Sequence, residues 1–362
     1  MEKILRALAI YLPQYHPIPE NDEWWGKGFT EWRNVVKGKV IVEGQYQPHL
    51  PADLGFYDLR LPEIMEEQAK LAQDHGIHGF CFYHYWFNGK RLLEMPVNNF
   101  LRSKRPDIPF CLCWANENWS RNWDGKFNES LIKQEYSEQD DIDHIKYLCE
   151  DVFSDDRYIK IDGKPVFVIY RPSLFPNINK TIETWQIEAK KYGYPGVYTV
   201  FFWGFDAGVE PKKWGFDAAA QFTPNKMSFV RKRAIFSELM RKLGIFAPLR
   251  SRFLVIKYKE VVDFYKKFVF PKDFRLFPCV TPMWDNYVRR REKGGTILTH
   301  STPALYQDWL ENVCERFEPR GEENLIFINA WNEWAEGNHL EPCEKWGSQY
   351  LEATGEVLKK YK

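Results

Sequence analysis

The chain has 362 residues, which is enough for one large domain or two ordinary ones, and its 50 basic and 50 acidic side chains give a formal net charge of zero. This balance excludes a global field that would draw the protein to nucleic acid or to a membrane surface. Aromatic residues make up 17% of the chain, and most of the 15 tryptophans lie beside Asn, Glu, Asp or Gly, a placement that favours a cleft for stacking on sugar rings.

The N-terminal stretch MEKILRALAIYLPQYHP has a basic start and an apolar run, as a secretory signal peptide does. Tyr11, Pro13 and Gln14 break the run early, and no small-residue cleavage site follows. We therefore expect a first core strand, and no apolar stretch approaches the ~20 residues that span a bilayer. The seven cysteines, four of them in apolar runs, indicate reduced thiols and a cytoplasmic protein.

Eight short runs rich in aromatic and β-branched residues recur along the chain. They cover residues 6–12, 78–86, 109–115, 164–171, 196–203, 216–222, 276–282 and 324–331. Continuous apolar runs are typical of strands that are covered on both faces, as in parallel sheets.

Helix-like segments separate these runs, at 61–76, 137–153, 177–196 and 302–317. The second of them opens with Ser137 and four acids, which is typical of a helix N-terminus. The alternation predicts an α/β fold, a single (β/α)8 TIM-type barrel domain over residues 1–362 with elaborated loops. A basic insertion at about 226–262 follows the sixth strand. A doubly wound open sheet is the alternative.

In such a barrel the active site lies at the carboxyl ends of the strands. Nearly every predicted strand exit carries an aromatic side chain together with an amide, acid, guanidinium or imidazole. We therefore expect an oligo- or polysaccharide cleft, lined by Tyr15, His16, Tyr83, His84, Trp86, Trp114, Asn116, Glu117, Trp119, Trp123, Arg171, Trp203, Gln221, Trp284, Asp285, Asn332 and Trp334.

The stretch NAWNEWAEG (329–337) places two acids, Glu333 and Glu336, three positions apart between tryptophans. On a helical turn these side chains share one face, about 5–6 Å apart. Two carboxyls this close in a partly desolvated pocket split their pKa values, which leaves one acid and one base. We predict that both are catalytic. The competing interpretation is a helix first turn, where acids are favoured by the helix dipole.

A second candidate acid is Glu117, in WANENWSRNWDG (114–125). An Asn-Glu pair at a strand end is similar to the pair that supplies the acid in many barrel glycosidases. A double displacement that uses Glu117 and Glu333 is therefore an alternative mechanism. Alternatively, Glu117 pairs with an arginine such as Arg121.

The remaining motifs carry weaker signals. The loop at 21–39 has two glycines but lacks the third of a dinucleotide fingerprint, so we expect its tryptophans to form a lid over the cleft. The eight histidines show no metal-ligand spacing, and we expect no metal and no cofactor. The basic segments 231–259 and 289–293 either contact an anionic glycan, lipid headgroups or an acidic partner, or form solvated faces.

Several motifs together resemble the WbsX-like family of polysaccharide and lipopolysaccharide gene sets, which is related to glycoside hydrolase family 99. They are AIYLPQYHP, GFTEWRNV, QPHLPADLGFYDLR, GFCFYHYWFNGKRLLEMP, WANENWSRNWDG and NAWNEWAEGNHLEP. The resemblance spans residues 5 to about 355. The family label implies a glycosyltransferase, whereas the relation to family 99 implies a retaining endo-α-mannosidase on a (β/α)8 barrel.

The resemblance to family 99 also implies a mechanism without a protein nucleophile. Glu333 would deprotonate the substrate's own 2-hydroxyl to form a 1,2-anhydro sugar, and Glu336 would protonate the leaving oxygen. Two other functions stay open. One is a glycosyltransferase or transglycosylase of surface polysaccharide assembly, for which Asp141 and Asp143 would supply an Asp-x-Asp pattern. The other is a non-catalytic glycan-binding module.

Overall fold

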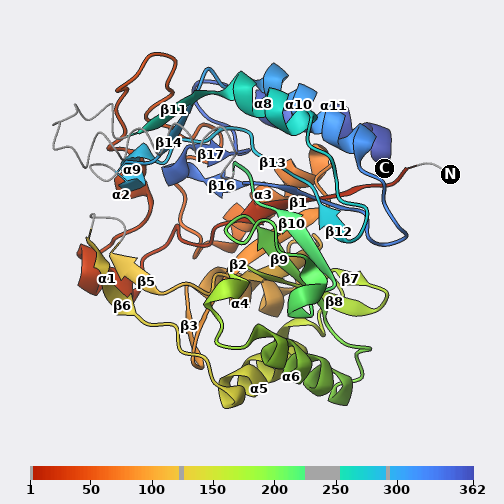
Figure 1. The fold of residues 1–362 in the computed structure, drawn as a ribbon. Helices are drawn as coiled ribbons and strands as arrows, with labels where there is room; N and C mark the ends of the chain where they lie inside the picture. Colours follow the sequence, from red (N-terminus) through yellow and green to blue (C-terminus); the bar gives the residue numbers. More distant parts are fainter. Residues whose placement is uncertain (1–2, 122–125, 225–252, 291–293) are drawn as a thin grey trace, which may run out of the picture.

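The computed structural model of the protein describes residues 3–121, 126–224, 253–290 and 294–362. At its centre, parallel strands curl into a barrel (Figure 1). Neighbouring strands follow the order β12-β10-β9-β8-β4-β2-β1-β15-β13. Their bounds are β1 (Arg6–Tyr11), β2 (Gly79–Phe87), β4 (Phe110–Trp114), β8 (Lys164–Ile169), β9 (Tyr198–Trp203), β10 (Ala218–Gln221), β12 (Arg275–Phe277), β13 (Cys279–Val280) and β15 (Leu325–Ile328).

The first and last strands in this order, β12 and β13, are two halves of one segment that is interrupted only by Pro278. β12 pairs with β10, whereas β13 pairs with β15, and the backbone N–H of Phe327 donates to the carbonyl of Pro278 at 2.8 Å. One segment therefore joins both edges of the sheet. The predicted (β/α)8 barrel is confirmed, with all eight predicted runs as its strands, and the doubly wound alternative is wrong.

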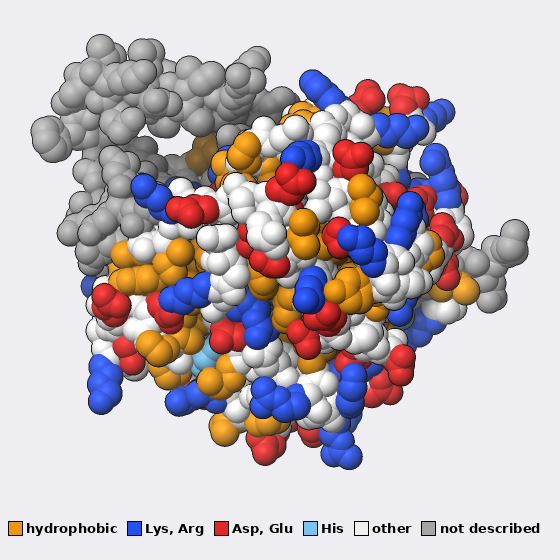
Figure 2. All heavy atoms as spheres, turned by 90° about the horizontal axis from the view of Figure 1, so that it is seen from below, with side chains coloured by type: hydrophobic (Ala, Val, Ile, Leu, Met, Phe, Trp, Pro, Cys, Tyr) orange, Lys and Arg blue, Asp and Glu red, His pale blue; other side chains and the backbone are white. Residues whose placement is uncertain are grey.

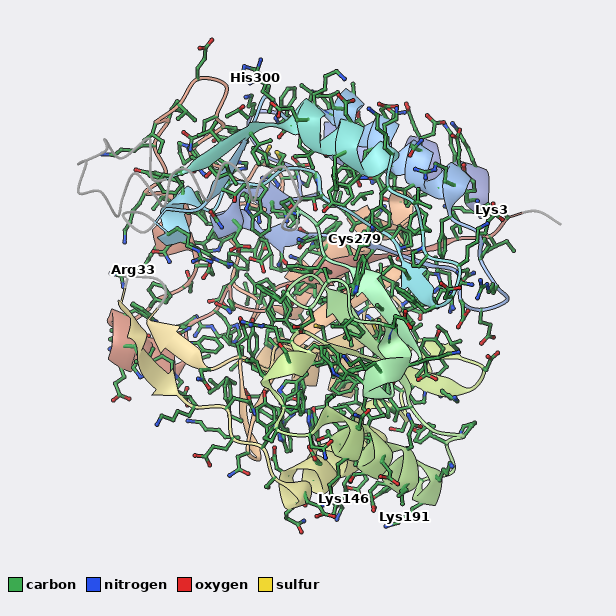
Figure 3. All side chains as sticks on the ribbon, in the orientation of Figure 1. Lys3, Arg33, Lys146, Lys191, Cys279 and His300 are labelled. Carbon is green, nitrogen blue, oxygen red and sulfur yellow. The ribbon has the colours of Figure 1, made fainter. Side chains whose placement is uncertain are left out.

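The barrel strands are apolar because both of their faces are covered. All nine residues of β2 are buried, and so are all five of β4. Such strands bury their side chains either in the barrel interior or under the surrounding helices, which is the favourable location for continuous apolar runs. All seven cysteines are buried free thiols, and Cys279 lies among the packed side chains at the centre of Figure 3.

Helices follow most of the strands and begin where the sequence predicts. The Ser137 hydroxyl accepts from the N–H of Asp140 at the start of α5, and Thr302 caps α10 in the same way. The longer helices are α3 (Pro62–Asp74), α4 (Met95–Ser103), α5 (Glu138–Tyr147), α6 (Ile178–Lys191), α8 (Tyr258–Lys266), α10 (Pro303–Arg316) and α11 (Gln349–Leu358). Figure 3 shows Lys146 of α5 and Lys191 of α6 at the outer surface, opposite α8, α10 and α11.

Short elements elaborate the loops, and many of them gather at the left of Figure 1, where the barrel strands end. They are α1 (Pro19–Trp25), α2 (Trp32–Val35), α9 (Tyr287–Arg290), the π-helix η1 (Leu148–Val152), the 3-10 helices η2 (Pro172–Leu174), η3 (Pro211–Trp214), η6 (Trp334–Glu336) and η7 (Lys359–Tyr361), and the strands β3 (Lys90–Leu92), β5 (Trp119–Arg121), β6 (Lys126–Ile132), β7 (Lys160–Ile161), β11 (Leu254–Lys257), β14 (Thr296–Thr299), β16 (Asn332–Glu333) and β17 (Asn338–His339).

The surface carries both signs of charge. On the face shown in Figure 2, basic and acidic side chains are interspersed over the described residues, in keeping with the net charge of zero. Within the described chain, none of the helices combines the length and the apolar character needed to cross a membrane. Most of the basic insertion, residues 225–252, lies outside the described residues, and so do residues 291–293.

Candidate active site

A cavity of about 420 Å³ opens where the barrel strands end, and it is lined by both aromatic and charged side chains. Its aromatic walls are Tyr83, Tyr85, Trp119, Tyr170, Phe205 and Phe222. Its charged side chains are Glu117, Arg171, Arg289, Arg290, Glu333 and Glu336. Flat rings beside hydrogen-bonding groups are what a sugar-binding cavity requires.

Glu333 and Glu336 lie on a tight hairpin rather than on the first turn of an ordinary helix. β16 pairs antiparallel with β17, and the three-residue 3-10 helix η6 connects them through Gly337. Side chains three positions apart are nearly eclipsed in a 3-10 turn, so both glutamates face the same cavity. The expectation of a helical turn is corrected in this respect, because the chain reverses direction at Gly337, where φ is +54°.

One guanidinium contacts both of these carboxyls. Arg289 Nη2 donates to Glu333 Oε2 at 2.7 Å, and Arg289 Nη1 lies 3.0 Å from Glu336 Oε1. A third carboxyl, that of Glu31, contacts Arg289 Nη2 at 3.2 Å. The side chain of Glu31 is fully buried and that of Glu333 is 6% exposed, whereas Glu336 is 19% exposed. Three acids therefore share one partly buried positive charge.

Burial and the neighbouring acids disfavour ionisation in this cluster. Burial raises the pKa of Glu333 strongly; Arg289 opposes the shift, and Glu336 and Glu31 reinforce it. Burial likewise raises the pKa of Glu31 to about 7, again against the effect of Arg289. Burial opposes the charged form of Arg289, but the three carboxyls outweigh it and raise its pKa well above the usual value. Arg289 is thus the group that permits these acids to ionise.

Three residues that the sequence predicted to line the cleft instead hold this hairpin to the barrel. Asn332 donates to the carbonyl of Leu12 and accepts from its N–H, at 3.0 and 2.7 Å. The Tyr15 hydroxyl donates to the carbonyl of Asn332 and accepts from the N–H of Trp334, at 2.8 and 3.1 Å. Trp334 Nε1 donates to the buried carboxyl of Glu341 at 2.6 Å. None of Tyr15, Asn332 and Trp334 lines the cavity; they hold the hairpin to the barrel.

Four predicted cleft residues besides the two glutamates line the cavity: Tyr83, Glu117, Trp119 and Arg171. Glu117 accepts from Arg171 Nη1 at 2.6 Å, so Glu117 pairs with an arginine; the side chain of Arg121 lies outside the described residues. The guanidinium of Arg171 lies 4.5 Å from the ring centre of Phe205. Asn116 is buried below this pair, where it accepts from the N–H of Arg171 and donates to its carbonyl.

His84 and Trp86 do not line the cavity, because successive residues of a strand point to opposite faces. Tyr83 and Tyr85 point into the cavity, whereas His84 Nε2 hydrogen-bonds His144 Nε2 at 2.9 Å and Trp86 stacks on His144. Burial lowers the pKa of His84 to about 3. These side chains pack β2 against α5.

The other predicted side chains away from the cavity also have structural contacts. Trp114 is fully buried and donates to the carbonyl of Trp86. His16 is fully buried, and burial lowers its pKa to about 4. Trp203 Nε1 donates to the carbonyl of Val209 at 3.1 Å, and Gln221 Oε1 accepts from the N–H of Cys279 at 3.3 Å.

Trp284 and Asp285 line a second cavity of about 30 Å³, beside Gly337. The carboxyl of Asp285 accepts from Gln45 Nε2 at 2.7 Å and from the N–H of Tyr287 at 2.9 Å. His49 also lines this second cavity and hydrogen-bonds His339 at 2.9 Å. Trp123 lies outside the described residues.

Two further expectations concern the loop at 21–39 and the Asp-x-Asp pattern. Trp32 is buried under Trp334 and Tyr15 rather than forming a lid, whereas Trp24 packs on Trp119 at the cavity. Asp141 lies in the first turn of α5, where Thr181 donates to it at 2.8 Å. In the described part of the chain, no three His, Cys, Asp or Glu side chains form a group that could hold a metal ion.

Several cavity residues were not among the predicted site residues. Tyr85 follows from strand alternation once Tyr83 is placed, whereas Tyr170 is next to Arg171 and does not follow from alternation. Arg289 and the remaining lining residues have no local signal, and neither does Glu31, which is buried behind the cavity wall. In the sequence, Arg289 is one residue of the basic segment 289–293. Its contact with Glu31 joins residues that are 258 positions apart.

A sequence model of the family described as "Glycosyltransferase WbsX" matches residues 7–354. Two relatives, each described as "Uncharacterized protein WxcX" and from two strains of Xanthomonas campestris pv. campestris, are 41% identical to the chain over 358 residues. The match covers 97% of this chain and 49% of each relative, so the chain spans about half the length of the curated relatives it matches.

Solved structures share the fold. A GH99 endo-alpha-mannosidase from Bacteroides thetaiotaomicron superposes with a TM-score of 0.60, 13% identity and coverage of 98% of this chain and 97% of that one. Its complex with BIS-TRIS-Propane gives a TM-score of 0.59 at 14% identity, with the same coverage. A "Glycoside hydrolase-like protein" gives 0.60 at 14% identity and covers 98% of this chain and 94% of that one.

Proposed function

Because the chain belongs to the WbsX family, we propose that it is a glycan-active enzyme whose catalytic residues are Glu333 and Glu336. One observation carries the proposal: two carboxyls share a single guanidinium at the wall of an aromatic cavity. The proposed reaction is retaining, endo-acting hydrolysis of α-linked, mannose-like glycans through a 1,2-anhydro sugar.

In the first step, the carboxylate of Glu333 takes the proton of the sugar's 2-hydroxyl, and that oxygen attacks the anomeric carbon. The bond from the anomeric carbon to the leaving oxygen breaks, and Glu336 gives its proton to that oxygen. Burial of Glu333 disfavours its carboxylate, but the contact with Arg289 at 2.7 Å opposes this effect and supports the carboxylate that this step requires. Glu336 is more exposed, so it suits the group that meets the leaving sugar.

In the second step, Glu336 takes a proton from water, and the water oxygen attacks the anomeric carbon. The anhydro ring opens at that carbon, and Glu333 returns its proton to the 2-oxygen. One proton therefore alternates between the two carboxyls, and the configuration is retained. Because no protein nucleophile is needed, Glu117 is assigned to substrate binding, together with Arg171, Tyr83 and Trp119.

The test is product analysis after the purified protein is incubated with a panel of α-mannans and O-antigen polysaccharides. We expect shorter oligosaccharides that retain the anomeric configuration. E336Q is expected to lose cleavage of glycosides with poor leaving groups by about 10²–10⁴-fold. E344Q, at an exposed site outside the cavity, is the matched control and is expected to behave as wild type.

The family description favours a second candidate, a glycosyltransferase or transglycosylase. Calorimetric binding of a nucleotide sugar with a divalent cation, without glycan cleavage, would support that candidate and contradict hydrolysis. Full activity of E336Q on substrates with poor leaving groups would overturn the assignment of the catalytic pair. Glycan binding without any turnover would contradict both catalytic candidates and support a non-catalytic glycan-binding module.

A further inference from the structure

Arg289 lies where three separate parts of the chain converge. Glu31 precedes α2, Arg289 is on α9, and Glu333 and Glu336 are on the hairpin after β15. Arg289 Nη2 contacts both Glu31 and Glu333, whereas Nη1 contacts Glu336. The planar guanidinium fixes the direction of each contact, so the two catalytic carboxyls are held at a set angle to one another.

Glu31 has no direct access to a substrate. It is fully buried and does not line the cavity. Three carboxyls, two of them buried, around one guanidinium leave an excess of negative charge, and desolvation makes such clusters poor sources of stability. Apolar side chains of similar volume would stabilise the fold as well or better. The cluster is therefore better explained by what it does to Glu333 and Glu336 than by a contribution to folding.

We propose that Arg289 and Glu31 are positioning residues: Arg289 orients both catalytic carboxyls and supports the ionised form of Glu333, and Glu31 holds Arg289 in place and limits that support. This inference rests on the proposed function, because it assigns Glu333 the role of base. It adds two residues that act on the reaction only through Glu333 and Glu336.

The charges around Glu333 determine the sign of each effect. Arg289 favours its carboxylate, whereas Glu336 and Glu31 disfavour it. Tyr15 and Tyr85 also lie near this cluster, and burial raises the pKa of both, so they stay neutral in the physiological range. Removing the charge of Arg289 therefore raises the pKa of Glu333, and removing the charge of Glu31 lowers it.

The experiment is a titration of ¹³C-carboxyl-labelled glutamate by NMR in the full chain, with the Glu333 signal assigned by its loss in E333Q. In R289Q the midpoint of Glu333 is expected to move to higher pH, and in E31Q to lower pH, each by about one unit or more. R33Q, at an exposed arginine outside the cavity, is the control and should leave the midpoint unchanged. A purely structural role would not move the two midpoints in opposite directions.

A second measurement uses kcat/KM as a function of pH on whichever glycan the product analysis identifies. R289K keeps the charge but loses the planar fork, so kcat is expected to fall by ~10²-fold while the acid limb stays near its wild-type position. If R289Q fails to fold, the proposal is tested by E31Q, whose Glu333 midpoint is expected to move to lower pH, and by R289K, whose kcat is expected to fall while its acid limb stays in place. Unchanged midpoints in both R289Q and E31Q, or shifts of the same sign, overturn the proposal. The titration needs no substrate, so it fails or succeeds independently of glycan cleavage.

Discussion

One guanidinium contacts three carboxyls, and this limits how many of the three are ionised at the same time. Glu31, Glu333 and Glu336 all contact Arg289, so each added negative charge raises the cost of the next. The same competition that would weaken a structural salt bridge is useful in a reaction that passes one proton back and forth. At the scale of single residues, the chemistry thus depends on an imbalance of charge.

The Glu117–Arg171 pair differs from this cluster in its exposure. Glu117 is 42% exposed and Arg171 is 29% exposed, so their ion pair contributes about 1 kcal/mol or less to stability. E117Q is therefore expected to raise KM and leave kcat and the melting temperature nearly unchanged. Steady-state kinetics on the identified glycan test this, with E135Q at an exposed site as control. A fall of kcat by several orders of magnitude would instead support a double displacement that uses Glu117 as the acid together with Glu333.

The sequence predicted the two acids but overestimated the number of side chains in the cleft. Nearly every strand exit carries aromatic and polar residues, yet on β2 only alternate ones face the cavity. Tyr83 and Tyr85 line it, whereas His84 and Trp86 pack against α5. Fully buried tryptophans such as Trp114 fill space between strands and helices. Composition alone cannot distinguish an aromatic side chain that lines the cavity from one that fills the space between strands and helices.

At the scale of elements, the hairpin β16–η6–β17 determines where the acids point. Gly337 has φ +54°, and a Cβ at this position would lie 2.8 Å from His49 Nε2 and 3.0 Å from Asp285 Cβ. The N–H of Asp285 donates to the carbonyl of Glu336 at 2.6 Å, so a shift there is transmitted to Glu336. A short apolar run followed by two acids resembles a helix start in sequence, because the reversal depends on one glycine and on distant contacts.

Gly337→Ala is expected to lower stability and also catalysis. A left-handed alanine costs about 1–2 kcal/mol, and the contact with Asp285 adds to this cost. Gly347 offers a matched control, because it has φ +52° and nothing within 4 Å of a Cβ. We expect G347A to show the backbone cost alone, and G337A to lose more stability and ~10²-fold in kcat. Equal melting temperatures and equal kcat in the two variants would contradict this role of the hairpin.

At the scale of the whole molecule, the fold was the most predictable feature. Continuous apolar runs, helix caps such as Ser137 and the regular alternation of elements are local signals that agree with one another. The closing contact of the barrel is not local, since β13 reaches β15 past Pro278. The positioning of Arg289 depends on the closed barrel and therefore could not be inferred from any one segment.

Buried carboxyls also make the stability of the whole fold depend on pH. Burial raises the pKa of Glu341 to about 7, although Trp334, Gln68 and Tyr57 donate hydrogen bonds to it. A raised folded-state pKa gives stability that is complete below the unfolded value and lost as pH rises through the folded one. A shift of this size corresponds to roughly 3 kcal/mol. Buried histidines have the opposite effect, but below about pH 6.5.

E341Q is therefore expected to remove the loss of stability that Glu341 causes as pH rises from about 4.5 to about 7, which makes the pH slope of the melting temperature over this range more positive than in wild type. Where Glu341 is protonated in both states, below about pH 4.5, E341Q should also be less stable than wild type by about 1–3 kcal/mol, because its NH₂ group would face hydrogen-bond donors. Thermal unfolding across this pH range tests the prediction, with E344Q at an exposed site as control. Equal slopes for wild type and E341Q would show that Glu341 does not titrate in this range.

The contacts of Arg289 with Glu31 and Glu333 span 258 and 44 positions of the chain. In the proposed reaction, the first loop of the barrel and the last two must therefore meet before a proton can be passed. A fragment that holds only the early or only the late strands lacks at least one member of the cluster of Glu31, Arg289, Glu333 and Glu336. Recovery of the proposed activity during refolding is therefore expected to report when the barrel has closed.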